Sequence, residues 1–325
     1  MSKLSVVIPV LNEREAIGDV VERVLTTRDE LRRRAGIAEL EVLVVDDGST
    51  DGTHEVVSAL TARNHDRRAG VRLIRHRRNR GYGAALQTGI DAARGSLLAI
   101  LDGDSTYPPE ELPSLCEVAV RSRAQLILGD RMSSRASRMP LMRLVGNIGF
   151  AWVASLLGGR RVADCCSGMR VMPAATWRAL RPLPSGLDFT PAMTVRALHR
   201  RLTMREVVIP YDVRIGRSKL SIVRDGLRFL VTILRETHHG NPARLRALLW
   251  PALALMVGLG TLAGTLGAWP GWGAPVAVTL AVLAGLLVAL ALAGWNLALK
   301  LSPPRLGLPC VTSDMRAAAD EEHRP

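Results

Sequence analysis

Two aspartates separated by one glycine, Asp102 and Asp104, follow the apolar run 97–101 and are well suited to hold a metal ion. A flexible glycine between two acids allows a loop to present both carboxylates to one divalent cation, such as Mg2+ or Mn2+. That cation would bridge to the phosphates of a substrate. Acidic pairs at such positions also cap helices, so the pair alone leaves a structural role open.

Polar residues follow two other apolar runs as well. Asp46 and Asp47 end one run and precede a series of glycine and hydroxyl residues. They could bind sugar hydroxyls or a base, and they could equally begin a helix. Asn12 and Glu13 bring an amide and a carboxylate to the end of the first apolar run.

The elements that must position these side chains can be read from the apolar runs 5–10, 41–45 and 97–101. These runs are rich in β-branched residues or leucine and are separated by stretches of helical character. This alternation predicts an α/β fold with a mostly parallel sheet. Ligands of open α/β sheets bind at the carboxyl ends of the strands, so we expect one site where the acids stand.

Two segments near the C-terminus, 247–268 and 274–299, contain no charged residue, and each is long enough to cross a bilayer as a helix. A soluble apolar hairpin is the alternative, but buried helices of this length without any charge are uncommon. The connection 269–273 is uncharged, whereas basic residues lie on the outer flanks, at Arg235, Arg244, Arg246, Lys300 and Arg305. The positive-inside rule therefore predicts a multi-pass protein of the cell membrane with a cytoplasmic catalytic domain.

The stretch 218–240 carries apolar residues at steps of three and four, namely Leu220, Val223, Leu227, Leu230 and Leu234. This spacing predicts one amphipathic helix, which either packs on the main domain or lies in the membrane interface. The segment 141–157 is apolar too, but Arg143 and Asn147 interrupt it and it falls short of a span. We expect an interfacial or buried helix there.

The formal net charge of +13 suits nucleic acid, anionic lipid or a phosphorylated substrate. The basic run 67–80 lacks interleaved aromatic residues for base stacking, so we expect no nucleic-acid partner and a solvated face near anionic lipid. The segment Gly81–Gly83 does not begin a dinucleotide fingerprint, because Leu86 stands where the third glycine belongs. The four cysteines form neither a disulfide framework nor a zinc pattern, which favours a reducing compartment and a packing role for adjacent Cys165 and Cys166.

Several motifs together resemble one family. Four segments occur in the order found in family 2 glycosyltransferases, namely 7–13 (VIPVLNE), 45–53 (VDDGSTDGT), 79–83 (NRGYG) and 102–110 (DGDSTYPPE). Three later segments resemble those of the dolichyl- or polyprenyl-phosphate sugar synthases within that family, namely 129–131 (GDR), 164–170 (DCCSGMR) and 214–220 (RIGRSKL). The resemblance implies a GT-A fold, Rossmann-like with a mostly parallel sheet, over residues 1–217. The amphipathic helix 218–240, a two-helix anchor at 247–299 and a cytoplasmic, partly disordered tail at 300–325 would follow.

The resemblance also implies roles for individual residues. Those expected to bind the nucleotide-sugar are Pro9, Asn12, Glu13, Asp46, Asp47, Asn79, Gly81, Asp102 and Gly103. Asp102 and Asp104 would form the metal site, and this chain has Ser105-Thr106-Tyr107 where the family often has a further metal contact from glutamine. Asp104, Arg131, Arg214 and Lys219 would be catalytic, and Ser167 and Arg170 would bind the acceptor phosphate.

The implied reaction is the inverting transfer of a hexose from a nucleotide-sugar to a polyprenyl or dolichyl phosphate at the cytoplasmic membrane face. A lipid phosphate is already an anionic nucleophile, so alignment and neutralisation of the leaving diphosphate suffice. The resemblance favours GDP-mannose, and UDP-glucose and UDP-N-acetylhexosamine donors are alternatives. A non-catalytic membrane scaffold is a weaker alternative, which the intact acid pair opposes. A processive polysaccharide synthase would carry a Gln-x-x-Arg-Trp motif, which is missing from this sequence.

Overall fold

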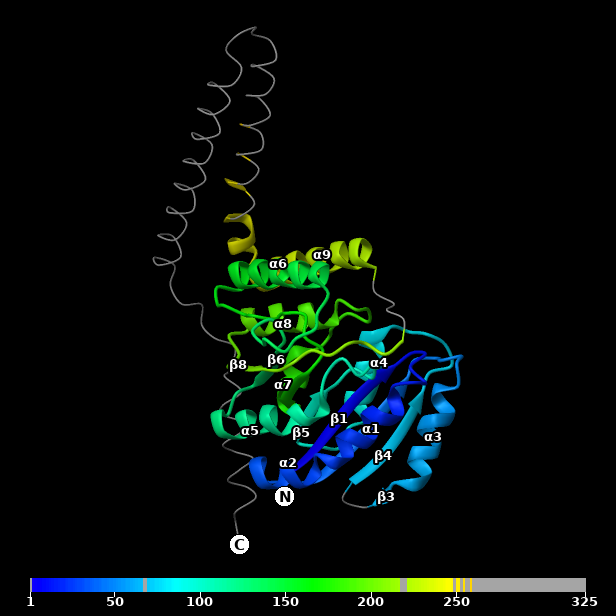
Figure 1. Cartoon of the computed structure of the whole chain (residues 1–325). Coiled ribbons are helices and arrows are strands. Elements are labelled where there is room, and N and C mark those ends of the chain that lie inside the picture. The colour runs from blue at the N-terminus through cyan, green and yellow to red at the C-terminus, as the bar shows by residue number, and fades with distance from the viewer. Residues whose placement is uncertain are drawn as a thin grey trace. The chain divides into compact units, whose positions relative to one another are not determined.

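A computed structural model describes residues 2–66, 69–216 and 221–247, together with residues 250, 251, 254 and 258. The chain divides into two units, residues 1–242 and 243–325, and the elements labelled in Figure 1 belong to the first. The predicted spans at 247–268 and 274–299 lie outside the described residues except for the few positions named above, and so does the predicted tail at 300–325. Lys219, which was expected to be catalytic, also lies outside them.

Eight strands of the first unit form one sheet in the order β3-β4-β2-β1-β5-β7-β6-β8. Strands β4, β2, β1 and β5 run parallel to one another, and β7 lies antiparallel to both of its neighbours. The strands are β1 (Ser2–Val10), β2 (Ile37–Asp46), β3 (His65–Asp66), β4 (Ala69–Arg75), β5 (Leu97–Ile100), β6 (Leu126–Asp130), β7 (Arg170–Pro173) and β8 (Met204–Val208). The predicted α/β fold is confirmed, and the sheet is mixed with its parallel part at the expected strands.

Helices cover both faces of this sheet. The main apolar core lies between the sheet and helices α1 (Ile17–Thr26), α2 (Arg28–Ala35), α3 (Thr53–Arg63) and α5 (Leu112–Ser122), the last preceded by the 3-10 turn η1 (Pro109–Glu111). On the other face, α4 (Tyr82–Ala92) packs on β1 and β2, and Gly89 lets its backbone approach Val7 and Val45 closely. Helices α7 (Ala174–Leu180) and α8 (Phe189–His199) follow β7.

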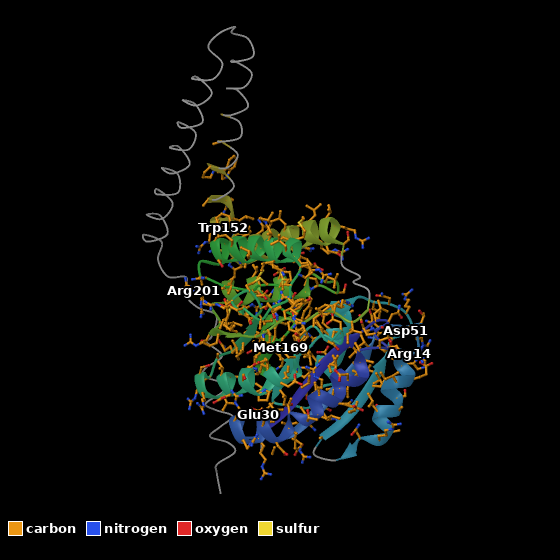
Figure 2. The ribbon with its side chains drawn as sticks, in the orientation of Figure 1. Arg14, Glu30, Asp51, Trp152, Met169 and Arg201 are labelled. Carbon is orange, nitrogen blue, oxygen red and sulfur yellow. The ribbon has the colours of Figure 1, made fainter. Side chains whose placement is uncertain are left out.

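Helices α6 (Leu141–Gly158) and α9 (Ile222–Gly240) pack against each other, and both contact α8 (Figure 1). Large apolar side chains of α6 are exposed at positions that share one helix face, namely Leu141, Val145, Ile148, Trp152 and Leu156. Figure 2 labels Trp152 on this helix, and its side chain is 66% exposed. Among the described residues, α6 alone is long and apolar enough to cross a membrane. Only 17% of this helix is buried inside the protein.

Part of the apolar stripe of helix α9 lies on the outside, whereas Leu230 and Leu234 are half-buried and Leu220 lies outside the described residues. Val223 is 83% exposed and Leu227 is 63% exposed, whereas Asp225, Phe229 and Ile233 are buried. The inward face holds polar groups because they have partners there: the Ser221 N–H donates to the Asp225 carboxylate at 2.7 Å. The sequence left open whether this stripe packs on the main domain or lies in the membrane interface. Val223 and Leu227 do not pack on the main domain.

Candidate active site

The site lies where β1, β2 and β5 end side by side. In the sheet Val10 pairs with Asp46 and Val7 pairs with Ile100, so the segments that follow these strands leave the same edge. The Asp47 N–H donates to the Val10 carbonyl at 2.8 Å, and the Leu101 N–H donates to the Val7 carbonyl at 3.1 Å. This register brings together acids that are far apart in the sequence, as a parallel sheet requires.

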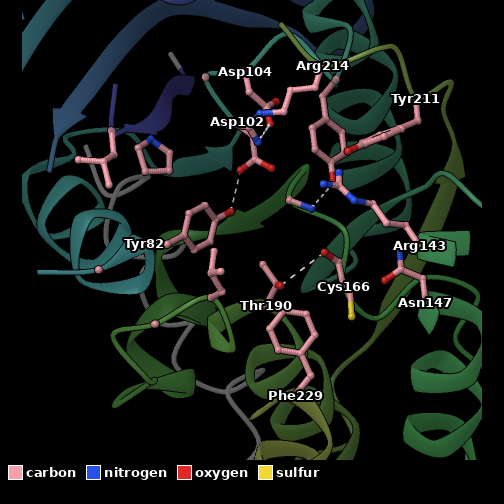
Figure 3. A pocket seen from close by; sticks show the side chains of 18 of the residues that line it. Tyr82, Asp102, Asp104, Arg143, Asn147, Cys166, Thr190, Tyr211, Arg214 and Phe229 are labelled. Atoms are coloured by element: carbon pink, nitrogen blue, oxygen red, sulfur yellow. Dashed lines mark hydrogen bonds and ion pairs between the residues drawn. The ribbon is translucent and has the colours of Figure 1, made fainter. Parts of the chain in front are cut away.

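Asp102 is held by a tyrosine and by a close backbone approach. The Tyr82 hydroxyl, from the first turn of α4, donates to Asp102 Oδ1 at 2.8 Å (Figure 3). A Cβ added to Gly168 would lie 2.4 Å from Asp102 Oδ2, so only glycine lets the loop 164–168 pack against this carboxylate. Burial and then the neighbouring Asp104 raise the pKa of Asp102 to about 7.

Asp104 is tied to its own loop and to an arginine from a distant segment. Its Oδ1 accepts hydrogen bonds from the Thr106 N–H at 3.1 Å and from the Thr106 hydroxyl at 2.5 Å. Its Oδ2 binds Arg214 Nη1 at 2.6 Å, and Arg214 Nη2 also binds Glu13. One guanidinium therefore joins the ends of β1 and β5.

Asp47 stands at the third strand end, and its carboxylate is buried. Asp47 Oδ1 lies 2.6 Å from His76 Nδ1 and accepts from the Arg80 N–H at 2.9 Å, and Oδ2 accepts from the Gly81 N–H at 2.8 Å. Gly81 has a φ of +104°, a left-handed value that favours glycine, and it leads directly into α4. The Asn-Arg-Gly motif thus fixes Asp47 through its backbone.

Arg131 lies at the end of β6 and is almost fully buried. It forms a two-pronged ion pair with Asp164, with Nε–Oδ2 at 2.6 Å and Nη2–Oδ1 at 2.9 Å. Its guanidinium also lies over the rings of Tyr107 and Tyr211, at 5.5 Å and 5.2 Å from their centroids. Arg131 is therefore a fixed, charge-paired cation in the wall of the site.

A pocket of about 440 Å³ connects these groups. The expected site residues that line it are Pro9, Glu13, Asp47, Asn79, Gly81, Asp102, Gly103, Asp104, Arg131 and Arg214. Its lining continues between α6 and α9 with residues that are mostly apolar, namely Met139, Met142, Arg143, Gly146, Asn147, Phe150, Gly226 and Phe229. The pocket thus has a polar end at the sheet and an apolar end between two helices (Figure 3).

Four of the expected residues that the structure describes do not line the pocket. Asp46 is fully buried and accepts from the Ser49 N–H at 2.8 Å, and Asn12 Oδ1 accepts from the Thr50 N–H at 2.8 Å. Both stabilise the turn that follows β2. Ser167 is fully buried.

Arg170 is the fourth of these residues, and it is fully buried as well. It donates to the carbonyls of Ser167 and Cys165 at 2.8 Å each. Arg170 thus holds its own loop together, and neither Ser167 nor Arg170 is among the residues that line the pocket.

Several pocket residues were not expected to be functional. Tyr82 lies one residue beyond the glycine of the NRG motif, at the first turn of a helix. That position could have indicated that its side chain faces the strand ends. Arg143 and Asn147 are one helical turn apart on α6 and both face the pocket (Figure 3). Sequence reasoning treated them as interruptions of an apolar helix.

The donor set fits a divalent cation. Asp102 and Asp104 offer hard oxygen ligands. The raised pKa of Asp102 shows that the surrounding protein does not fully offset the negative charge of the ionised carboxylate. Among the described residues no group of three or more His, Cys, Asp and Glu side chains is placed to hold a metal. Further ligands would therefore come from phosphate oxygens or water.

The sequence and fold place the chain in a family of sugar-transferring enzymes. Residues 5–174 match the family described as Glycosyl transferase family 2. The chain belongs to this family and is a glycosyltransferase.

Three curated relatives share much of this chain. A dolichyl-phosphate hexose transferase of Haloferax volcanii is 33% identical over 67% of this chain and 86% of its own length. A dodecaprenyl-phosphate galacturonate synthase of Rhizobium johnstonii is 36% identical over 68% of this chain and 63% of its own length. The low-salt glycan biosynthesis hexosyltransferase Agl6 of Haloferax volcanii is 30% identical over 69% of this chain, and the chain spans only 51% of that relative.

Solved structures share the fold. Glucosyl-3-phosphoglycerate synthase from Mycobacterium tuberculosis, in complex with uridine diphosphate, superposes with a TM-score of 0.55 at 21% identity. The match covers 73% of this chain and 80% of that one. At this identity the likeness establishes a GT-A-like fold and nothing about the substrate.

Proposed function

We propose that this chain transfers a sugar from a nucleotide-sugar to a polyprenyl or dolichyl phosphate at a membrane surface. One observation carries the proposal: a single pocket joins the acid pair Asp102 and Asp104 to an apolar opening between α6 and α9. A nucleotide-sugar is polar throughout, whereas a phosphorylated polyprenol is a polar head on an apolar chain. A pocket with one polar and one apolar end accommodates both. The names of the dolichyl- and dodecaprenyl-phosphate relatives support the same acceptor class.

The polar end is assigned to the donor. Asp47, fixed by the Arg80 and Gly81 N–H groups, accepts from the nucleoside, and Glu13 lies beside it at the end of β1. Asp102 and Asp104 hold Mg2+ or Mn2+, which when bound neutralises the donor diphosphate. Arg214 lies within reach of the same phosphates because it already binds Asp104.

The apolar end is assigned to the acceptor. Arg143 and Asn147 are polar positions on an otherwise apolar wall, so they bind the lipid phosphate, while Phe150 and Phe229 contact the first isoprene units. Phosphate oxygens bind guanidinium groups through charge-assisted hydrogen bonds. This assignment replaces Ser167 and Arg170, which lie outside the pocket lining.

The reaction needs no strong base. The acceptor phosphate is anionic near neutral pH, so alignment of its oxygen with the anomeric carbon is the main task of Arg143 and Asn147. Attack from the face opposite the leaving diphosphate inverts the anomeric configuration. A product with retained configuration in its NMR spectrum would exclude this single displacement.

The exposed apolar faces of α6 and α9 are assigned to the membrane surface. Val145 and Trp152 on α6 and Leu227 on α9 are each more than 60% exposed, and buried polar residues are on the inward side of α9. A helix lying in the interface places its apolar face among the acyl chains. The pocket opening then meets the depth at which a polyprenyl phosphate carries its headgroup, with the catalytic domain on the cytoplasmic side.

The donor sugar is identified by experiment. Purified protein is incubated with polyprenyl phosphate, Mn2+ and, separately, GDP-mannose, UDP-glucose or UDP-N-acetylglucosamine, and sugar in the organic phase is measured. GDP-mannose is the donor we propose, and the exposed Asp19→Asn variant is the matched control for Asp104→Asn. Transfer from one donor that Asp104→Asn abolishes and Asp19→Asn retains supports the proposal. Absence of a glycolipid from every donor contradicts it.

A further inference from the structure

Cys165 and Cys166 form a pair of thiols in the wall of the pocket. Their sulfur atoms lie 3.5 Å apart, and both residues belong to a turn between Asp164 and the start of β7. Cys165 is fully buried, whereas Cys166 is half-buried and lines the pocket (Figure 3). One thiol can therefore meet a small solute, and the other lies directly behind it.

The peptide that joins the two cysteines is anchored at both of its polar atoms. The Cys165 carbonyl accepts from Arg170 Nη2 at 2.8 Å and from the Thr194 hydroxyl at 3.0 Å. The Cys166 N–H donates to Asp164 Oδ1 at 3.1 Å. A change in this one peptide therefore reaches three side chains.

Asp164 connects this peptide to the proposed catalytic groups. The oxygen that accepts from Cys166, Oδ1, also binds Arg131 Nη2 at 2.9 Å, and Arg131 lines the pocket. Farther along the same loop, Gly168 packs directly on Asp102. The loop thus contacts both Asp102 of the acid pair and Arg131.

We propose that Cys165 and Cys166 are a redox modification site, which a peroxide converts to a disulfide between neighbouring residues and which thereby slows sugar transfer. Such a bond closes a small ring that includes the Cys165–Cys166 peptide. The two sulfurs must approach from 3.5 Å to about 2.0 Å, so the ring twists the anchored peptide. Strained and accessible disulfides are the readily reduced ones, so the modification is reversible by thiols.

The chemistry balances with hydrogen peroxide as the oxidant. The Cys166 thiolate attacks one peroxide oxygen, the O–O bond breaks, and a sulfenic acid and hydroxide result; the proton that the thiol had released converts the hydroxide to water. The Cys165 sulfur then attacks the sulfenic sulfur, the S–S bond forms, the S–O bond breaks and a second water leaves. Two thiols lose two electrons and two protons, and one peroxide takes them up and becomes two waters.

The test treats the folded, full-length protein with hydrogen peroxide and then, because Cys165 is fully buried, unfolds it before blocking the remaining thiols with N-ethylmaleimide. Peptide mass spectrometry without reduction is expected to show the peptide with both cysteines unalkylated and lighter by two hydrogen atoms. Transfer is expected to fall several-fold and to recover with dithiothreitol. Cys165→Ser is expected to abolish the reversible loss, and Cys116→Ser, which removes a buried thiol of α5, is expected to keep it.

A second measurement covers the case in which Cys165→Ser does not fold. Phenylarsine oxide bridges two nearby thiols, so it is expected to protect both cysteines of the native protein from alkylation, and Cys166→Ser is expected to remove that protection. The proposal is overturned if Cys165 and Cys166 are both alkylated after peroxide treatment. It is also overturned if Cys165→Ser or Cys166→Ser loses as much activity to peroxide, reversibly, as the wild type does. The mass measurement does not depend on transfer, so its outcome is separate from that of the proposed function.

Discussion

Arg214 binds Asp104 at 2.6 Å and thereby places a positive charge beside the proposed metal site. Its other terminal nitrogen binds Glu13, and its Nε is buried without a hydrogen-bond partner among the described residues. A cation in this position competes with a metal ion for Asp104 and also offers a charge to a phosphate. The two effects can be separated experimentally.

Replacing Arg214 by glutamine is expected to tighten Mn2+ binding in the absence of nucleotide and to slow transfer. Removing the positive charge leaves Asp104 free for the metal, whereas the donor phosphates lose a charge-assisted contact worth about 1.5–3 kcal/mol, or roughly tenfold to a hundredfold in rate. Titration calorimetry with Mn2+ checks the first effect and the transfer assay checks the second. The exposed Arg181→Gln is the control, and unchanged Mn2+ affinity in Arg214→Gln contradicts this account.

The stability of the metal-free protein is expected to fall as the pH rises from 5 to 8. The pKa of Asp102 is about 7 in the folded protein and lies near its ordinary 3.8 when the chain unfolds. The folded state therefore binds the proton more tightly, and the cost of ionising the desolvated Asp102 carboxyl beside Asp104 grows between pH 3.8 and 7 and is complete above pH 7. That cost is of the order of a few kcal/mol.

Asp102→Asn removes this dependence and raises the melting temperature at pH 8 in the presence of EDTA, although it lowers transfer. Thermal unfolding of both proteins at pH 5 and pH 8 is the measurement, with Asp19→Asn as the matched control. Equal melting temperatures of wild type and Asp102→Asn at pH 8 would show that the carboxylate is not buried as described.

Arg143→Gln is expected to raise the KM for polyprenyl phosphate by roughly tenfold or more, because a charge-assisted contact with the acceptor is lost. The KM for the donor is expected to change little, since Arg143 lies on α6 and the acid pair follows β5. Arg143→Lys is expected to restore part of the affinity. A rise in the KM for the donor alone would show that Arg143 contacts the donor and not the acceptor.

A charge on the exposed face of α6 is expected to impair use of a lipid acceptor. Val145 on α6 and Val120 on α5 are similarly exposed, at 61% and 50%, and only Val145 belongs to the apolar face of α6 and α9. Val145→Glu is therefore expected to raise the acceptor KM in vesicles several-fold, whereas Val120→Glu is expected to leave it unchanged. Equal effects of the two variants argue against a membrane contact at α6.

The sequence predicted the polar end of the pocket well because that end is built on strands. Short apolar runs rich in β-branched residues or leucine located β1, β2 and β5, and acids that follow parallel strands must meet at one edge. Glu13, Asp47 and Asp102 accordingly lie together. The later motifs were harder to interpret, since Arg170 has the same residue type whether it binds a phosphate or its own loop carbonyls.

The apolar end of the pocket was not predicted because its residues lie on helices whose orientation depends on packing. The stripe on α9 satisfied the usual pattern of a core-facing helix, yet Val223 and Leu227 are exposed, and Asp225, which accepts from Ser221, is buried beside Phe229 and Ile233. Arg143 and Asn147 looked like interruptions for the same reason. Only the tertiary contacts of α6 and α9 reveal which side faces the pocket.

The most direct test of the central claim compares acceptors that differ only in the phosphate. The protein is placed in vesicles with polyprenyl phosphate or with the corresponding polyprenol. Mn2+ and the nucleotide-sugar that serves as donor in the comparison of three donors, carrying a labelled sugar, are added, and the labelled lipid is measured. The account predicts labelled lipid with the phosphate alone and none after EDTA treatment. Labelling of the free alcohol, or transfer to 3-phosphoglycerate with none to the lipid phosphate, would contradict it.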